Sequence, residues 1–511
     1  MEESLYNHYI IICMNTLLFF MHKERGIFVN YVELFVFIAY FVFMVGIGLY
    51  FFRKSKDAGE KDYFLGGRNM GAWVSALSAG ASDMSAWVLM GLPASIYVSG
   101  MGQTWIAIGL GIGYALSWIF MAPRLRRFSI AANDSITIPQ YLTNRFLSKN
   151  KSLQILCAVI FLVAYTIYAA SSIKACGTLF NSVMGIDPTV AMYIAAFIII
   201  AYTFLGGFSA VCWTDFFQGM IMLAALLIAP LFALALAGAG DAVGTGTSLP
   251  DGFFNFLTTP QEIISGLGWG LGYFGMPHII IRFMSLKSEK ELRKSSVIGI
   301  SWTTIILIMS AMTAIAGRLY LGEINDASTV FITMVRRIFP ALVSGLLLSA
   351  ILSAAMSTAD SQLLAASSAF ASDVYKPVIR KNASNTEMLW AGRIVVIVIA
   401  VIALFIASDP NSGTIMGLVE NAWGVFGAAF GPVILLSLFW KKLTFGGTVA
   451  GIAVGAGVDI LWLAFLSSTD IYEIVPGFAA GLLTAVVVSL CTKGPGKDVE
   501  DLFDRAVNLK S

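Results

Sequence analysis

The sequence predicts an all-α polytopic membrane protein with about 13 transmembrane helices, built around a five-plus-five inverted-repeat transporter core with two broken helices. Three observations predict this class. First, 58% of the 511 residues are hydrophobic and only 12% are charged, about half the roughly 25% found in soluble proteins. Second, long apolar runs fill most of the chain. Third, polar residues and glycines interrupt two of these runs at matching places.

Thirteen apolar runs are candidates for membrane-spanning helices, each of which takes about 20 residues. We expect helices over residues 31–52, 73–97, 102–122, 153–173, 188–205, 213–237, 263–284, 297–319, 341–364, 389–407, 417–439, 445–466 and 475–491. The 32 Lys and Arg nearly balance the 30 Asp and Glu, so no basic stripe indicates nucleic acid. We therefore expect a lipid bilayer around the chain, no nucleic acid, and no obligatory protein partner.

The basic residues predict the orientation of the spans. Short cytoplasmic loops carry more Lys and Arg than outer loops do. With the N-terminus outside, 26 of the 32 Lys and Arg lie in the inner segments, and the outer loop 238–262 has none. We expect a multi-pass protein of the cell (cytoplasmic) membrane whose C-terminus is cytoplasmic.

The spans divide the chain into seven segments. These are an N-terminal extension (1–28), a first peripheral helix with a cytoplasmic loop (29–72), the first five-helix repeat (73–237), an extracellular loop (238–262), the second five-helix repeat (263–440), two peripheral helices (441–491) and a cytoplasmic tail (492–511). Within the extension, the apolar run 9–21 is too short to span a bilayer. We favour an over-long gene model with a start at Val29 over an interfacial anchor. The tail is too short for the signalling domain of a membrane sensor.

The second and seventh spans are poor continuous helices. The second places Ser82, Asp83 and Ser85 beside a glycine, and the seventh carries five glycines before Pro277. Unpaired backbone groups in hydrocarbon cost several kcal/mol each, so such breaks survive where they line a cavity. Because they lie five spans apart, the two five-helix units face opposite ways, as in inverted-repeat secondary transporters. The alternative for a glycine-rich span is close helix packing.

Asp83 is an intramembrane carboxylate, which costs roughly 2.5–3.5 kcal/mol at a helix centre and indicates function by default. A bound cation would offset that cost, and sodium, as a hard cation, should favour oxygen ligands. Ala354, Ser357 and Thr358 share one face of the ninth span because they are spaced i, i+3 and i+4. Proton coupling is the alternative, with the proton on Asp83 or His278.

The other acidic residues near spans carry less information. Asp215, Asp360 and Glu420 fall near span ends, where we expect exposure to water. Asp459 lies inside a predicted span without an explanation. The sequence also lacks an H-E-x-x-H motif and a nucleophile elbow, so it predicts a transporter and not an enzyme.

Four stretches of the chain resemble the sodium/solute symporter family, and most closely its sodium/proline members. They are residues 76–85 (ALSAGASDMS), 206–215 (GGFSAVCWTD), 268–278 (GWGLGYFGMPH) and 356–362 (MSTADSQ). The resemblance extends from about Tyr31 to the last span. It implies a co-transported sodium ion held by the carbonyls of Ala81, Met84 and Ala354 and the hydroxyls of Ser357 and Thr358, with Asp83 close to the ion.

The resemblance also implies L-proline as the imported substrate. The family pattern points to Ser85, Trp87, Tyr168, Trp269, Tyr273 and Pro277 as substrate-binding residues. Aromatic faces suit the apolar ring of proline, while helix ends take its carboxylate and secondary ammonium. Ala86 and Met276 depart from the family pattern, which has glycine and commonly glutamine at these places. The departures keep another small solute, such as a different amino acid or a betaine, open as the substrate.

Overall fold

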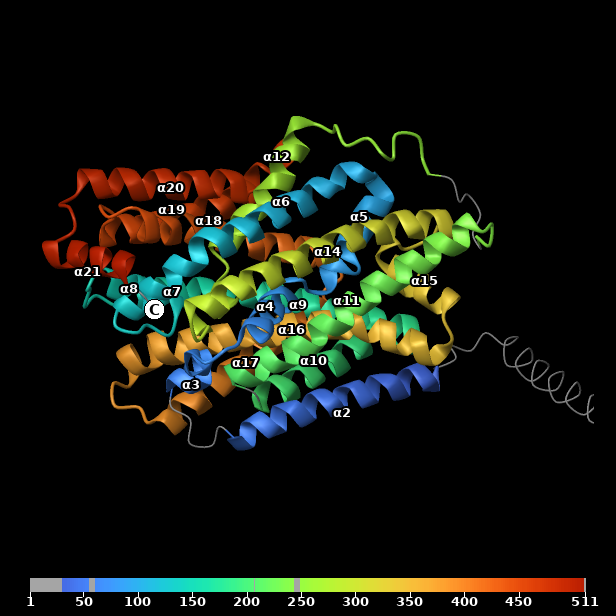
Figure 1. Ribbon diagram of the computed structural model, residues 1–511, viewed down its shortest axis with the longest axis horizontal. Helices are drawn as coiled ribbons and strands as arrows, with labels where there is room; N and C mark the ends of the chain where they lie inside the picture. The colour runs from blue at the N-terminus through green and yellow to red at the C-terminus, as the bar shows by residue number, and fades with distance from the viewer. Residues whose placement is uncertain (1–29, 55–59, 206, 243–248, 510–511) are drawn as a thin grey trace, which may run out of the picture.

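The computed structural model describes residues 30–54, 60–205, 207–242 and 249–509, and these residues are mainly helical (Figure 1). The helices are α2 (Tyr31–Lys54), α3 (Glu60–Leu65), α4 (Ala72–Asp83), α5 (Gly91–Ser99), α6 (Thr104–Leu116), α7 (Ala122–Ala131), α8 (Ile138–Arg145), α9 (Ser152–Met184), α10 (Pro188–Leu205), α11 (Phe208–Gly238), α12 (Pro260–Gly268), α13 (Pro277–Ser285), α14 (Glu289–Leu321), α15 (Val330–Ile338), α16 (Ala341–Ser368), α17 (Asn385–Ser408), α18 (Ile415–Phe439), α19 (Phe445–Phe465), α20 (Ile474–Cys491) and α21 (Lys497–Asn508). The predicted start at Val29 and the run 9–21 lie outside the described residues.

Each predicted span falls on one helix or on shorter helices in series. Among the described residues, ten helices are long and apolar enough to cross a membrane, and two shorter apolar helices cover Ala86–Ser99 and Pro188–Ala201. The predicted all-α membrane class is therefore confirmed. The count of thirteen spans, the seven segment boundaries and the orientation of the termini stay predictions.

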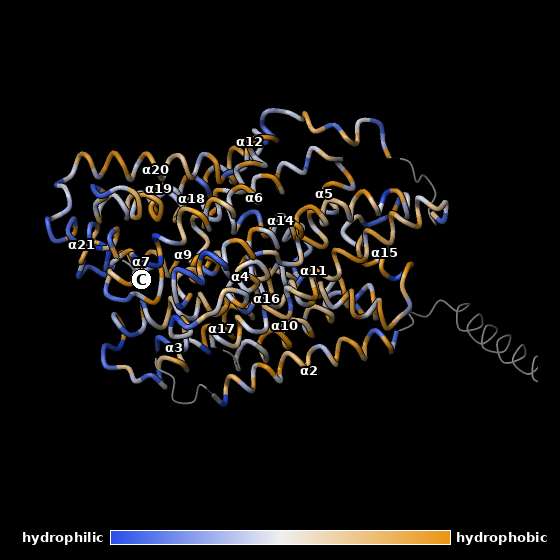
Figure 2. The backbone as a smooth tube through the Cα atoms, viewed as in Figure 1, coloured by the Kyte–Doolittle hydropathy of each residue, from blue (hydrophilic) through white to orange (hydrophobic). Residues whose placement is uncertain are grey.

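Apolar side chains cover the outside of the bundle. Hydrophobic residues follow α2 and α20 along the periphery (Figure 2), and large ones such as Phe35 and Phe405 are exposed. By contrast, 78% of the 18-residue apolar stretch of α16 is buried, and the same share is buried in α18. Since lipid is as apolar as these outer side chains, this distribution suits a bilayer and leaves α16 and α18 in the protein interior.

Both predicted helix breaks are present. After Asp83 the chain leaves the helix at Met84 (φ −77°, ψ 67°), and it becomes extended at Ser85 before a short 3-10 turn, η2 (Ala86–Val88). In the seventh span, α12 runs into a 3-10 segment, η5 (Trp269–Phe274), and α13 begins at Pro277. Proline suits this first helical position because it has no N–H to leave unpaired.

The glycines of the seventh span also provide close packing. A Cβ atom on Gly113 of α6 would lie 2.2 Å from the carbonyl oxygen of Gly270 in η5. A Cβ atom on Gly270 would lie 2.3 Å from the carbonyl oxygen of Gly109. The break and the close-packing explanations therefore both apply to this span.

The C-terminal helix α21 packs against the ends of the bundle. The Arg145 guanidinium of α8 donates a hydrogen bond from Nη1 to the Val499 carbonyl (3.2 Å). The Phe503 ring lies edge-on to Phe128 of α7, with ring centroids 5.1 Å apart. The segment predicted as a cytoplasmic tail thus forms a docked amphipathic helix.

Candidate functional site

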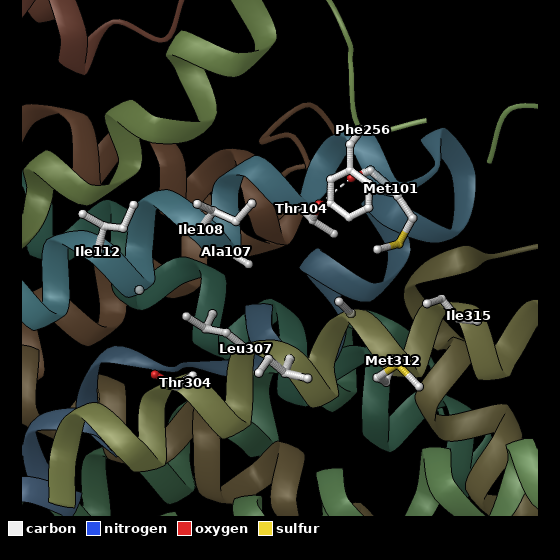
Figure 3. A pocket seen from close by; sticks show the side chains of 13 residues that line it. Met101, Thr104, Ala107, Ile108, Ile112, Phe256, Thr304, Leu307, Met312 and Ile315 are labelled. Carbon is white, nitrogen blue, oxygen red and sulfur yellow. Dashed lines mark hydrogen bonds between the residues drawn. The ribbon is translucent and has the colours of Figure 1, made fainter. Parts of the chain in front are cut away.

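A groove of about 450 Å³ lies between α6 and α14 and is bordered by Phe256 (Figure 3). Its lining is mostly apolar and includes Ile108, Ile112 and Leu307. None of the predicted site residues lines this groove. The chemistry predicted from the sequence lies instead at the two helix breaks.

The end of α4 meets the middle of α16 at the predicted ion site. The Ser357 hydroxyl donates to the carbonyl oxygens of Ala81 (2.8 Å) and Ala354 (3.2 Å). Thr358 is fully buried, and its Oγ1 has no hydrogen-bond partner in the described part of the chain. Met84 is buried where α4 unwinds. The structure thus brings Ala81, Ala354 and Ser357 into contact and places an unsatisfied hydroxyl beside them.

Small side chains make this approach possible. Residues 354–359 of α16 read Ala-Ala-Met-Ser-Thr-Ala, and α4 offers Ala79 and Ala81. Small residues let two helix backbones come close together. Because the backbones are close, a hydroxyl of one helix reaches a carbonyl of the other.

Asp83 joins the two broken helices. Its Oδ2 accepts a 2.5 Å hydrogen bond from the Tyr273 hydroxyl of η5. Its Oδ1 is buried and has no partner among the described residues. The carboxylate therefore faces the second break, and its predicted place near the ion stays a prediction.

Aromatic rings gather around the second break. The Tyr273 ring lies 5.1 Å from Trp423 of α18, and the Trp269 ring lies 5.0 Å from Tyr472. The Trp423 indole N–H donates to the Trp269 carbonyl (2.8 Å). A Cβ on Gly272 would lie 2.0 Å from Trp423 Nε1, so this glycine makes room for the indole. The sequence did not single out Trp423 or Tyr472, because neither belongs to a polar break.

Three more of the predicted substrate residues, Ser85, Trp87 and Tyr168, lie around the first break. Ser85 Oγ accepts from the Trp87 backbone N–H (3.5 Å), and the Trp87 indole donates to the Asp83 carbonyl (3.3 Å). The Tyr168 hydroxyl lies near Ser85 and Trp87 and is buried, and none of the residues that the structure describes is its hydrogen-bond partner. The Tyr168 ring is 6.4 Å from His278, in the first turn of α13 after Pro277.

Two acidic residues expected to contact water are buried, which corrects the prediction. Asp215 and Asp360 are both 0% exposed. Glu420 is half-buried, so it fits the expectation only in part. Their positions near span ends misled because α11 begins at Phe208, before the predicted run, and α16 continues to Ser368, beyond it. Asp215 and Asp360 therefore lie inside the bundle.

Asp215 forms a buried ion pair that the sequence did not predict. Its Oδ2 lies 3.2 Å from Nη2 of Arg282, which is near the end of the predicted span 263–284. The Ser78 hydroxyl donates to Asp215 (2.6 Å) and accepts from Arg282 Nε (3.1 Å). Ser361 of α16 accepts from Arg282 Nη2 (2.6 Å). Four helices, α4, α11, α13 and α16, thus meet at one polar cluster.

The sequence and the structure were compared with known proteins. A family model described as "Sodium:solute symporter family" matches residues 63–455. The high-affinity proline transporter PutP of Bacillus subtilis (strain 168) is 43% identical over 468 residues, which cover 90% of this chain and 98% of that protein. The sodium/proline symporter of Haemophilus influenzae is 42% identical over 485 residues, or 91% of this chain and 95% of that protein.

Solved structures give the same architecture. A Na⁺-coupled sialic acid symporter in a substrate-bound, outward-open state matches with a TM-score of 0.74 at 21% identity, over 91% of this chain and 99% of that one. MhsT in complex with L-phenylalanine matches with a TM-score of 0.54 at 14% identity, over 83% of this chain and 98% of that one. At these identities the likenesses concern the fold, and they confirm the predicted fold class.

Proposed function

Because the chain belongs to the sodium:solute symporter family, we propose that it imports L-proline together with sodium across the cell membrane. The curated relatives named above are described as proline transporters and match nine-tenths or more of the chain. The observation that carries the proposal is the contact of the Ser357 hydroxyl with two carbonyls at the break in α4, beside the unpartnered Thr358 hydroxyl.

Sodium is proposed to bind between α4 and α16. Its ligands are the carbonyls of Ala81, Met84 and Ala354 and the hydroxyls of Ser357 and Thr358. Leaving a buried hydroxyl unsatisfied costs about 1–3 kcal/mol, and a cation at this place would give Thr358 a partner. Asp83 contributes negative charge near the break, which favours a cation in a medium of low dielectric constant.

Proline is proposed to bind between the two breaks. Trp269 and Tyr273 of η5 offer aromatic faces for the pyrrolidine ring. The helix ends near Ser85 and Pro277 present backbone N–H groups, which suit the carboxylate. Tyr168 and Trp87 complete the pocket on the side of the first break.

Coupling follows from the short stretch of chain that the two sites share. The proposed sodium ligands Ala81 and Met84 directly precede Ser85 and Trp87 of the proposed substrate site. An ion that fixes the end of α4 therefore also fixes the first substrate residues. The ion raises the affinity for the substrate only if it binds more tightly to the conformation that also binds the substrate.

The orientation with a cytoplasmic C-terminus is part of the proposal. It rests on the excess of Lys and Arg in the segments assigned to the inside. A cysteine introduced at Ser511 should react with a membrane-impermeant reagent only after the cytoplasmic face is opened. Reaction in intact cells would contradict this orientation.

Sodium dependence tests the ion site. Thr358→Ala should raise the sodium concentration for half-maximal proline uptake by proteoliposomes about 10- to 150-fold, because a ligand to a charged group contributes roughly 1.5–3 kcal/mol. Thr313→Ala is the control, since the Thr313 hydroxyl is bonded to the Met309 carbonyl of its own helix (2.9 Å). An unchanged sodium dependence in Thr358→Ala would refute the proposed cage.

Substrate identity is tested by competition. Unlabelled proline should displace labelled proline at lower concentration than other amino acids or betaines do. Stronger competition by a betaine would favour the alternative that Ala86 and Met276 keep open. Uptake driven by a proton gradient without sodium would favour proton coupling through Asp83 or His278.

A further inference from the structure

Two acidic side chains are buried together between α18, α19 and α20, outside the proposed sodium and proline sites. Asp459 of α19 is 1% exposed, and Glu473, the residue before α20, is 6% exposed. Both carboxylate oxygens of Asp459 and Oε1 of Glu473 have no hydrogen-bond partner in the described chain. Such groups are costly to bury without a partner.

Gly424 of α18 brings the two acids to one place. A Cβ atom on Gly424 would lie 2.9 Å from Asp459 Oδ1 and 3.3 Å from Glu473 Cγ. Both side chains thus border the volume that a larger residue at 424 would fill. The absent side chain leaves room beside α18 for the Asp459 carboxyl group and the Glu473 side chain.

Further acids lie around the pair, and the described part of the chain places no ion-pairing base there. Glu420 lies one turn before Gly424 on α18, and Tyr472 precedes Glu473 and donates to the Glu420 carbonyl (2.8 Å). Asp470 is exposed in the turn between α19 and α20. Within the described ranges, neither Asp459 nor Glu473 takes part in a salt bridge. Two neighbouring carboxylates in such a site cannot both be ionised without strong repulsion.

The positive species that relieves this repulsion is more simply a proton than a metal ion. A hard metal cation is held by several oxygen ligands, such as the five proposed for sodium between α4 and α16. In the part of the chain that the structure describes, no group of three or more His, Cys, Asp or Glu residues is placed to hold a metal ion. A single proton on one of two neighbouring carboxyl groups is enough to relieve their repulsion, as in carboxyl pairs that share one proton.

We propose that Asp459 and Glu473 form a proton-binding site in which the pair holds one proton at neutral pH. Asp459, the more buried member, carries the proton, which removes its negative charge beside Glu473. Glu473 keeps its negative charge because it lies at the N-terminus of α20, where the helix dipole favours an anion. The proton is taken from water and returned to water, so no other group is consumed.

The pair is linked to the proposed substrate pocket through one side chain. Tyr472 is covalently adjacent to Glu473, and its ring packs against Trp269. Loss of the proton would place two negative charges at the contact of α19 and α20 and push these helices apart. We therefore expect uptake to decline at alkaline pH, a consequence that rests on the proposed function.

Infrared difference spectroscopy on the purified full-length protein tests the site without sodium or proline. The wild type should show a carbonyl band of a protonated carboxylic acid that is present at neutral pH and lost at alkaline pH. Asp459→Asn should remove this band, and Glu473→Gln should move its loss to lower pH, because the repelling charge is gone. Asp470→Asn, an exposed acid in the same turn, is the control and should leave the band unchanged.

Two outcomes would overturn the proposal. One is a spectrum that is the same in the wild type, Asp459→Asn and Glu473→Gln, which would mean that the pair holds no proton. The other is loss of the wild-type band on adding sodium at constant pH, which would assign the pair to a metal ion. Since neither result depends on transport, failure of this proposal is distinguishable from failure of proline symport.

Transport measurements test the link to the pocket. Uptake by the wild type should fall between neutral and alkaline pH, whereas Asp459→Asn, which is permanently neutral, should keep its neutral-pH rate. Asp470→Asn should follow the wild type. Parallel pH profiles for the wild type and Asp459→Asn would contradict the link.

Discussion

Removing one member of the buried pair Asp215–Arg282 should destabilise the protein more than removing both. Each side chain is at most 1% exposed, so solvent screens neither charge. Arg282→Met would leave Asp215 with the hydroxyls of Ser78 and Ser361 and without a cation. Asp215→Asn would leave the Arg282 guanidinium buried without its anion.

The expected size follows from this burial. Breaking a buried ion pair by removing one partner costs about 3–5 kcal/mol. Replacing both partners by neutral residues of similar volume is often neutral or stabilising. The double variant Asp215→Asn/Arg282→Met should therefore be more stable than either single variant, and the two effects should not add.

The assay is reversible unfolding in detergent micelles, applied to the wild type and the three variants. Lys441 and Asp504 provide the matched control, because they form a shorter contact (2.6 Å against 3.2 Å) whose side chains are 36% and 54% exposed. Exposed ion pairs contribute about 0–1 kcal/mol. If Arg282→Met costs no more than Lys441→Met, or if the two single losses sum to the double loss, the reasoning from burial is refuted.

Two further substitutions test the helix breaks. Gly113→Ala should lower the unfolding free energy by about 1–3 kcal/mol, because its Cβ would meet the backbone of Gly270 at 2.2 Å. Gly111→Ala is the control and should be tolerated, because the nearest neighbour of its Cβ would be Leu307 at 3.8 Å. Equal thermal stability of the two variants would contradict the packing argument. Tyr273→Phe should weaken substrate binding about 10- to 150-fold, because it removes a hydrogen bond to a carboxylate worth about 1.5–3 kcal/mol. Equilibrium binding measures this effect, with the exposed Tyr193→Phe of α10 as control; unchanged affinity in Tyr273→Phe would show that the Asp83 contact does not position the pocket.

The helix breaks could be predicted because their signal is local. Gly80, Asp83 and Ser85 disfavour a continuous helix within a few residues of one another, and the glycines before Pro277 do the same. The carbonyl and hydroxyl groups that meet at the proposed ion site are harder to predict, because they come from distant parts of the chain. The Ser357 contact with Ala81 joins residues 276 positions apart, which is too far along the chain for a local pattern to predict.

The buried ion pair could not be predicted from local patterns. Asp215 and Arg282 each lie near the end of an apolar run, where a charge usually faces water. Only the packing of α11 against α4 and α13 places them inside. The aromatic partners Trp423 and Tyr472 were missed for the same reason, because their contacts with η5 come from segments far along the chain.

The sequence of the C-terminal helix α21 carries an amphipathic pattern and no long apolar run. Val499, Leu502, Phe503 and Ala506 are spaced i, i+3, i+4 and i+7 and are the buried residues of α21. This spacing is typical of an amphipathic helix. The helix contains no long apolar run, because polar residues occupy its other face, so it was not among the predicted spans.

The arrangement of the Asp215 cluster also has a consequence for synthesis of the protein. Arg282 follows Asp215 by 67 residues, which a ribosome adds in roughly 3–13 s at about 5–20 residues per second. During that interval α11 carries an acid whose cation has not yet been made. Ser78, already synthesised on α4, can supply the first hydrogen bond. The nascent first half is therefore chemically incomplete until α13 arrives, and expression of that half alone should leave it exposed to membrane quality control.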